Sequence, residues 1–157
     1  MGDAVVLLKE ANILLQRADH MLYITYPLIK DNKLIISILE NLSNSLIKTM
    51  EAVLYYERMY KRIDMFPDSF EVKFDIFKEK CARTYNFDRE HVVLIEDLRK
   101  IVHERKKSKM EFIRKDKYVI CTNNYATKVL TIDKLKEYLN ISKIFIKKVN
   151  TILKNVR

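Results

Sequence analysis

The chain has 157 residues, with 30 Lys or Arg against 21 Asp or Glu, and its formal net charge at pH 7 is +9. A single Gly and two Pro exclude folds built on many tight turns, such as all-β domains, and favour long helices. Two distant cysteines exclude a disulfide framework, and no apolar run approaches the length of about 18 residues that a membrane span needs. We therefore expect one helical domain over residues 1–157, in the cytoplasm and away from membranes.

The first helical pattern lies near the N-terminus. Apolar residues from Ala4 to Leu22 recur at alternating spacings of three and four, which places them on one face of a helix. Pro27 follows in the stretch "TYPLIKDN". Because proline disfavours helical backbone in the residue before it, we expect the first helix to end there.

The second pattern is the longest in the chain. It runs from Ile35 to Tyr60 with the same period, and neither Gly nor Pro interrupts it. Asp31 or Asn32 can cap its start by accepting hydrogen bonds from free backbone N–H groups. A short connection between two long helices predicts that they lie antiparallel, as in a bundle.

Two further helices follow Pro67. Asp68 and Glu71 have the spacing of a capping box, with Asp in place of the usual Ser or Thr. Asp88 can cap the fourth helix, which we expect to reach about Lys107. The third helix carries a largely aromatic stripe of Phe70, Phe74, Phe77 and Cys81.

The helical pattern breaks near residue 112. Residues 118–121 and 126–130 are rich in β-branched and aromatic side chains and flank "TNNY", which predicts a short hairpin within about 112–131. Thr131 or Asp133 then opens the last helix. The fold class predicted is all-α, a bundle of about five helices with a short β-hairpin between the last two.

Three polar residues of the fourth helix are candidates for chemistry. Glu96, Arg99 and His103 follow spacings of three and four, so their side chains should share one side of the helix. A histidine can act as a general acid or base near neutral pH, and an arginine can hold a phosphate with two hydrogen bonds. The simpler interpretation is an exposed ion pair beside a surface histidine, and both interpretations stay open.

The chain resembles the HEPN superfamily of small helical bundles in two features. Its second helix, "LSNSLIKTMEAVLYYERMYKRI", has small and apolar residues leading to a longer tail, and Arg99 and His103 lie late in the fourth helix. The resemblance implies a dimeric bundle that is either a metal-independent ribonuclease or an inactive binder of RNA or nucleotides. Members of the family carry four to six residues between the Arg and the His, whereas "RKIVH" carries three.

Positive charge is concentrated in the last part of the chain. Residues 1–97 contain 13 Lys or Arg and 16 Asp or Glu, a net charge of −3, whereas residues 98–157 contain 17 and 5, a net charge of +12. Such a surface attracts polyanions, and aromatic residues among the cations can stack on unpaired bases. The residues we expect to contact nucleic acid are Arg105, Lys106, Lys107, Lys109, Arg114, Lys115, Lys117 and Tyr118.

The leading hypothesis is a non-catalytic, homodimeric module that binds RNA or another polyanion without a cofactor or metal. The first alternative is a metal-independent endoribonuclease of HEPN type that uses Arg99, His103 and Glu96. The second is a scaffold protein whose acidic first half pairs with a partner helix or a second copy. The short Arg–His spacing favours binding over catalysis, and the uneven charge favours binding over scaffolding.

Overall fold

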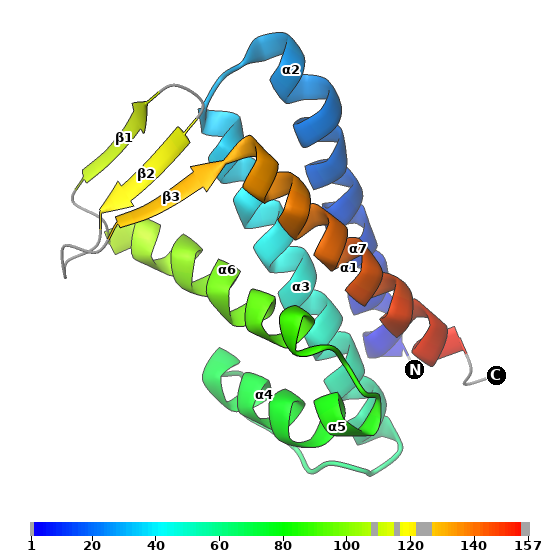
Figure 1. Ribbon diagram of the computed structural model, residues 1–157. Helices are drawn as coiled ribbons and strands as arrows, with labels where there is room; N and C mark the ends of the chain where they lie inside the picture. The colour runs from blue at the N-terminus through cyan, green and yellow to red at the C-terminus, as the bar shows by residue number, and fades with distance from the viewer. Residues whose placement is uncertain (1, 108–109, 115–116, 122–126, 155–157) are drawn as a thin grey trace.

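The computed structural model is a helical bundle with a small antiparallel sheet at one end (Figure 1). The structure describes the backbone of residues 2–107, 110–114, 117–121 and 127–154, and the side chains of residues 3–104 and 129–154. Four long helices form the bundle: α1 (Gly2–His20), α3 (Lys33–Met59), α6 (Arg89–Lys107) and α7 (Ile132–Lys154). The short helices α4 (Phe70–Ile76) and α5 (Ala82–Thr84) lie at the end away from the sheet. The all-α bundle expected from the sequence is confirmed.

Helix α3 is the centre of the core. It packs against α1, α6 and α7 and also contacts α4, so apolar residues on most of its circumference are buried. Its fully buried residues include Ile35, Leu42, Leu46, Met50 and Leu54. None of the described helices is both long enough and apolar enough to cross a membrane.

The prediction that the first helix ends before Pro27 is wrong. A π-helical turn, η1 (Met21–Thr25), follows α1 directly and leads into α2 (Tyr26–Ile29), whose first turn contains Pro27. In the wider turn the Tyr26 N–H donates to the carbonyl of Met21, five residues back. A local widening of this kind accommodates a ring that lacks an N–H and would clash with a regular helical turn. The helix ends instead at Lys30, whose backbone is left-handed with φ 54°.

The predicted caps have mixed outcomes. The Asp31 carboxylate accepts a hydrogen bond from the Lys33 N–H at 3.0 Å, which confirms the cap of α3. The capping box of Asp68 and Glu71 is wrong, because Ser69 is the residue that precedes α4 and its side chain caps no backbone N–H. The Asp68 carboxylate lies 2.6 Å from the Lys73 ammonium instead, since a buried cation needs an anionic partner more than a helix end does.

Helix α4 continues through a second π-helical turn, η2 (Phe77–Cys81), into α5. Phe74, Phe77 and Cys81 are buried and Phe70 is half-buried, so the predicted stripe faces the core. Helix α6 begins at Arg89, directly after Asp88, as expected.

The strands described between α6 and α7 are three: β1 (Met110–Arg114), β2 (Lys117–Cys121) and β3 (Thr127–Thr131). All pair antiparallel in the order β1-β2-β3, with Val119 opposite both Phe112 and Val129. The hairpin of β2 and β3 confirms the prediction, and β1 is an addition to it. Leu130, which is buried, joins the sheet to the core, and the Thr131 hydroxyl accepts a hydrogen bond from the Lys134 N–H at 3.1 Å, which caps α7.

Candidate functional site

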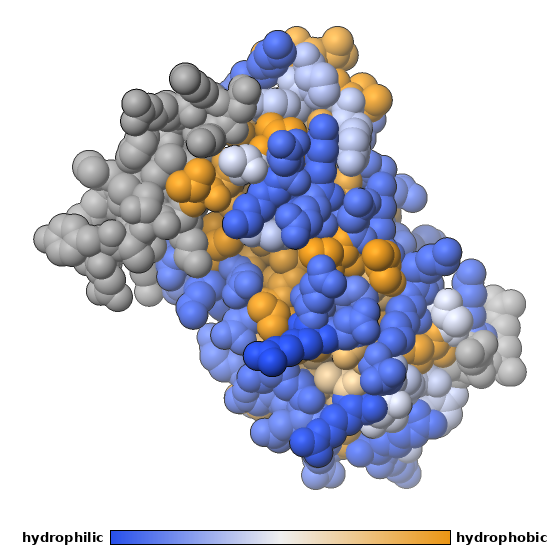
Figure 2. Space-filling model, in the orientation of Figure 1, coloured by the Kyte–Doolittle hydropathy of each residue, from blue (hydrophilic) through white to orange (hydrophobic). Residues whose placement is uncertain are grey.

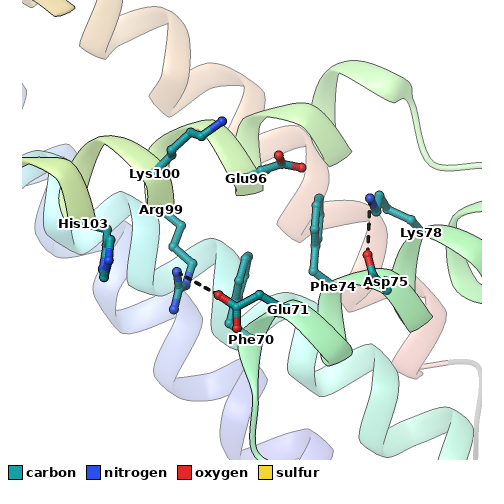
Figure 3. A pocket seen from close by; sticks show the side chains of 9 residues that line it. All are labelled: Phe70, Glu71, Phe74, Asp75, Lys78, Glu96, Arg99, Lys100 and His103. Carbon is teal, nitrogen blue, oxygen red and sulfur yellow. Dashed lines mark ion pairs between the residues drawn. The ribbon is translucent and has the colours of Figure 1, made fainter. Parts of the chain in front are cut away.

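The three candidate residues of α6 line one open groove. Glu96, Arg99 and His103 line a space of about 350 Å³ between α6 and α4, and Lys100 of α6 also belongs to its lining (Figure 3). The α4 segment and the turn that follows it supply Phe70, Glu71, Phe74, Asp75 and Lys78. The expectation that the three side chains share one side of the helix is therefore confirmed.

The local sequence explains how the two helices form this groove. In α6, Leu94, Leu98 and Ile101 are buried, which turns the stripe of Glu96, Arg99 and His103 toward the edge of the core. In α4, the rings of Phe70 and Phe74 stack with their centroids 5.4 Å apart. Their spacing of four places them on the same side of the helix. The groove thus has an aromatic wall on α4 and a polar wall on α6.

Arg99 is held by two contacts from α4. Its guanidinium carbon lies 4.1 Å from the centroid of the Phe70 ring, within the range of a cation–π contact. Its Nη1 lies 3.9 Å from Oε1 of Glu71, as the dashed line in Figure 3 shows. The Arg99 side chain keeps 32% of its surface exposed, so solvent or a ligand still reaches it.

The carboxylate of Glu71 has its own supports. The Ser69 hydroxyl donates to its Oε2 at 3.2 Å. A hydrogen bond from its own backbone N–H and that Ser69 bond lower the pKa of Glu71, and the neighbouring Arg99 and His103 add smaller effects. Glu71 therefore stays ionised at neutral pH and is a weak base.

The remaining charges of the groove nearly balance. Lys78 pairs with Asp75 at 3.5 Å and lies 4.8 Å from the centroid of Phe74. The lining holds the carboxylates of Glu71, Asp75 and Glu96 against the cations Lys78, Arg99 and Lys100. In Figure 3, Arg99 and His103 point to the same side of α6, whereas Lys100 extends away from α4. The groove itself is thus a mixed surface, and a strong positive field must come from neighbouring residues.

The predicted nucleic-acid-binding residues follow the groove directly in the chain. Arg105, Lys106 and Lys107 belong to the last turn of α6, Arg114 ends β1, and Lys117 and Tyr118 begin β2. Their side chains, like Lys109 and Lys115 altogether, lie outside the described residues. Their contacts stay a prediction.

Three lysines of α7 contact neighbouring elements. Lys143 pairs with Asp19 of α1 at 3.3 Å, and the Lys136 ammonium lies 5.4 Å from the ring centroid of Tyr23. On another side of the same helix, Lys148 donates to the Asn86 carbonyl at 2.6 Å. These three cations join α7 to its neighbours.

Sequence reasoning did not find the α4 side of the groove. The sequence places Phe70 on an aromatic stripe and predicts a capping role for Glu71, and the stripe on α6 does not indicate which helix it faces. The spacing of Phe70 and Phe74 was the available signal, since an aromatic pair at the edge of a stripe can line a groove.

No metal centre emerges from the part of the chain that the structure describes, where no group of three or more His, Cys, Asp or Glu side chains could hold an ion. Comparison of the chain with models of known protein families, with curated proteins and with solved structures found no match.

Proposed function

We propose that this protein is a cytoplasmic, non-catalytic module that binds single-stranded RNA through the α4–α6 groove and the basic segment that follows it. The observation that carries the proposal is the meeting of Arg99, His103 and Phe70 in one open groove. The chain that leaves this groove at the end of α6 enters the most basic tract of the sequence.

The chemistry of the groove suits a nucleotide. A guanidinium can donate two parallel hydrogen bonds to phosphate oxygens, and a histidine can contribute a third donor. Unpaired RNA bases stack on aromatic rings and on arginine planes. The net charge of +12 over residues 98–157 would attract the backbone from a distance and release its counterions on binding.

Binding is better supported than cleavage. Cleavage through the 2′-hydroxyl needs a base to remove a proton and an acid to protonate the leaving oxygen. Among the described residues of the groove, His103 is the single imidazole, and the lowered pKa of Glu71 makes it poor in either role, so Glu96 is the candidate that remains for the second group. The spacing of Arg99 and His103, with three residues between, also departs from the family pattern.

Titration of a single-stranded RNA at several salt concentrations tests the proposal. We expect the logarithm of the affinity to fall steeply with the logarithm of the salt concentration, because phosphate contacts release counterions. The variant Arg99→Gln should bind more weakly and with a slope shallower by about one. Arg83→Gln, an exposed arginine of α5 outside the groove lining, is the matched control. Binding that ignores salt, or equal losses in the two variants, would contradict the proposal.

The ribonuclease alternative keeps one observation in its favour, which is that Glu96, Arg99 and His103 line the same groove. Incubation of RNA with the protein in EDTA decides between the two functions. We expect no cleavage. Cleavage that His103→Ala abolishes would replace binding by catalysis as the function.

We further propose that the protein is a homodimer, paired through α1. Exposed apolar residues recur along the first helical segment: Val6 and Ile13, which are seven apart and so on one side of α1, then Ile24 in η1 and Leu28 in α2. Figure 2 shows hydrophobic side chains at the tip of α2 within a mostly hydrophilic surface. In an antiparallel pair, Arg17 of one copy would lie opposite Glu10 of the other, which also contacts Lys48 within its own chain at 2.8 Å.

Light scattering tests the dimer. We expect the mass of two chains for the unaltered protein and of one chain for Ile13→Glu, because a charge at the centre of the pairing would be buried without a partner. A single-chain mass at high concentration for the unaltered protein would contradict this proposal and would support neither dimer nor scaffold.

A further inference from the structure

We propose that Glu71 makes the α4–α6 groove selective for a terminal phosphate of RNA over the phosphodiesters within the strand. This inference rests on the RNA-binding function proposed above. Its basis is that Glu71 Oε1 lies 3.9 Å from Arg99 Nη1, so the guanidinium already has an anion where a ligand phosphate would meet it.

Glu71 is placed to compete and can also be displaced. The Ser69 hydroxyl holds its Oε2 at 3.2 Å, which leaves Oε1 turned toward Arg99. The side chain is 74% exposed, so little packing is lost when it moves away. An incoming phosphate therefore exchanges with this carboxylate instead of filling an empty position.

Arg99 itself has less freedom to leave. Its guanidinium lies over the Phe70 ring at 4.1 Å, and that ring stacks in turn on the buried Phe74. Moving the arginine toward a distant phosphate would break the cation–π contact. The ligand must come to the arginine, at the place that Glu71 now occupies.

The charge of the ligand decides the exchange. An internal phosphodiester carries one negative charge, as the carboxylate does, so replacing one by the other gains little attraction. A terminal phosphate monoester carries about −1.5 to −2 at neutral pH and offers three strong acceptor oxygens. It can accept hydrogen bonds from two N–H groups of the guanidinium and retain an oxygen for His103, which lines the same groove.

The size of the groove agrees with recognition of an end. A volume of about 350 Å³ is near the lower limit of small-molecule pockets, which suits one terminal nucleotide. The remainder of the strand would then be left to the basic segment, whose phosphate contacts carry no preference for an end.

The test uses one single-stranded oligoribonucleotide in three forms, with a 5′-phosphate, with a 3′-phosphate and with neither, titrated by fluorescence anisotropy at one salt concentration. We expect the unaltered protein to bind one phosphorylated form about tenfold more tightly than the unphosphorylated form. The variant Glu71→Gln should bind the unphosphorylated form more tightly and reduce the preference to about twofold. Which phosphorylated form is favoured identifies the end.

Asp75→Asn is the matched control. It removes the same charge from the same groove. Asp75, however, contacts Lys78 at 3.5 Å, so the carboxylate of Glu71 stays beside Arg99 in this variant. We expect this variant to keep most of the preference. Equal losses of preference in Asp75→Asn and Glu71→Gln would show a general charge effect and overturn the inference.

Titration of the three forms with the unaltered protein and with Arg99→Gln gives a second decisive outcome. If it binds all three forms equally while Arg99→Gln still weakens binding, the selectivity is wrong and the proposed function stands. If Arg99→Gln binds all three forms as the unaltered protein does, the groove is not the RNA site and both proposals fail.

Discussion

His91 lies inside the protein at the start of α6. Its side chain is 3% exposed, and its ring centroid lies 5.7 Å from that of Phe145. Its Nδ1 has no hydrogen-bond partner among the described residues, and its Nε2 lies 3.9 Å from an oxygen of Asp88. Burial lowers the pKa of His91, and the positive charge of Lys148 acts in the same direction, whereas Asp88 and Glu90 act against them. The folded protein therefore holds a neutral imidazole.

Because the imidazole of His91 is buried and neutral, we expect the folded protein to lose stability in mild acid. The unfolded chain binds the proton near its ordinary pKa of about 6.5, whereas the folded chain resists it. The free energy of unfolding should thus have its full value above pH 7 and fall as the pH drops below about 6.5. Urea unfolding at pH 7.5 and pH 5.5 measures the loss, and His91→Phe should reduce it. His20→Gln, at an exposed site, is the control and should keep the loss of stability between the two pH values. If His91→Phe loses as much stability as this control, the prediction is contradicted.

Burial and charge also produce a polar cluster around Glu57, which we do not interpret as a functional site. The carboxylate is 4% exposed, accepts a hydrogen bond from the Tyr85 hydroxyl and lies 3.1 Å from Arg62. A buried charge needs such partners, and here both donate to Oε1 of the carboxylate. Burial, followed by the charge of Glu57, raises the pKa of the neighbouring Cys81 to about 12. Cys81 is therefore an unreactive core thiol.

At the scale of the element, three helical segments end on residues with left-handed backbone. These are Lys30, Lys61 and Asn86, with φ values of 54°, 57° and 53°. Glycine adopts this conformation without a steric cost, but the one glycine of the chain is Gly2. The ends of the helices are thus made by residues that disfavour the conformation they adopt.

Glycine at these positions should stabilise the protein. We expect Lys30→Gly or Lys61→Gly to raise the free energy of unfolding by about 1 kcal/mol, because each relieves a left-handed lysine. Asn86→Gly should raise it less, since asparagine tolerates this conformation better than lysine. Urea denaturation of the three variants gives the comparison. A loss of stability in Lys30→Gly would show that its side chain has a role that the described contacts do not include.

The sequence predicts that the long helices exist, because this depends on periodicity. It predicts where they end less accurately. The stripes of α1 and α3 predicted both helices, since burial on one face acts over many residues. The end of the first helix predicted from Pro27 is wrong because a single wider turn accommodates a proline. Strand β1 was missed because its sequence, "MEFIR", lies within the basic tract and alternates too briefly to stand out. The α4 side of the groove depends on tertiary packing, which no local pattern encodes.

At the scale of the whole molecule, the two halves of the chain do not form separate acidic and basic bodies. Helix α7, from the basic half, packs on α1 and α3 from the acidic half. Its Lys143 meets Asp19 across that boundary. Part of the positive charge is therefore neutralised where the halves meet, and the proposed attraction to RNA rests on the cations between α6 and α7.

A buried lysine couples the groove to this assembly. Lys73 of α4 is 7% exposed, and its ammonium lies 3.0 Å from Glu51 of α3 and 2.6 Å from Asp68. Burial acts to lower the pKa of Lys73, but the hydrogen bonds and charges of the two carboxylates outweigh it, so the net shift is upward and the lysine stays charged. This contact ties the helix that carries Phe70 and Glu71 to the central helix of the bundle.

Replacing this lysine should therefore change stability and RNA binding together. Lys73→Met keeps the apolar stem but leaves Glu51, which is 19% exposed, without its cation, so we expect the free energy of unfolding to fall by about 3 kcal/mol. Loosening of α4 should separate Phe70 and Glu71 from Arg99, weaken RNA binding under conditions where the protein stays folded, and speed amide exchange in α4. Lys143→Met, which breaks an exposed ion pair, should change stability by less than about 1 kcal/mol and leave α4 exchange unaltered. If a destabilised Lys73→Met keeps full RNA affinity, the position of α4 is irrelevant to binding. The groove would then not be the RNA-binding site.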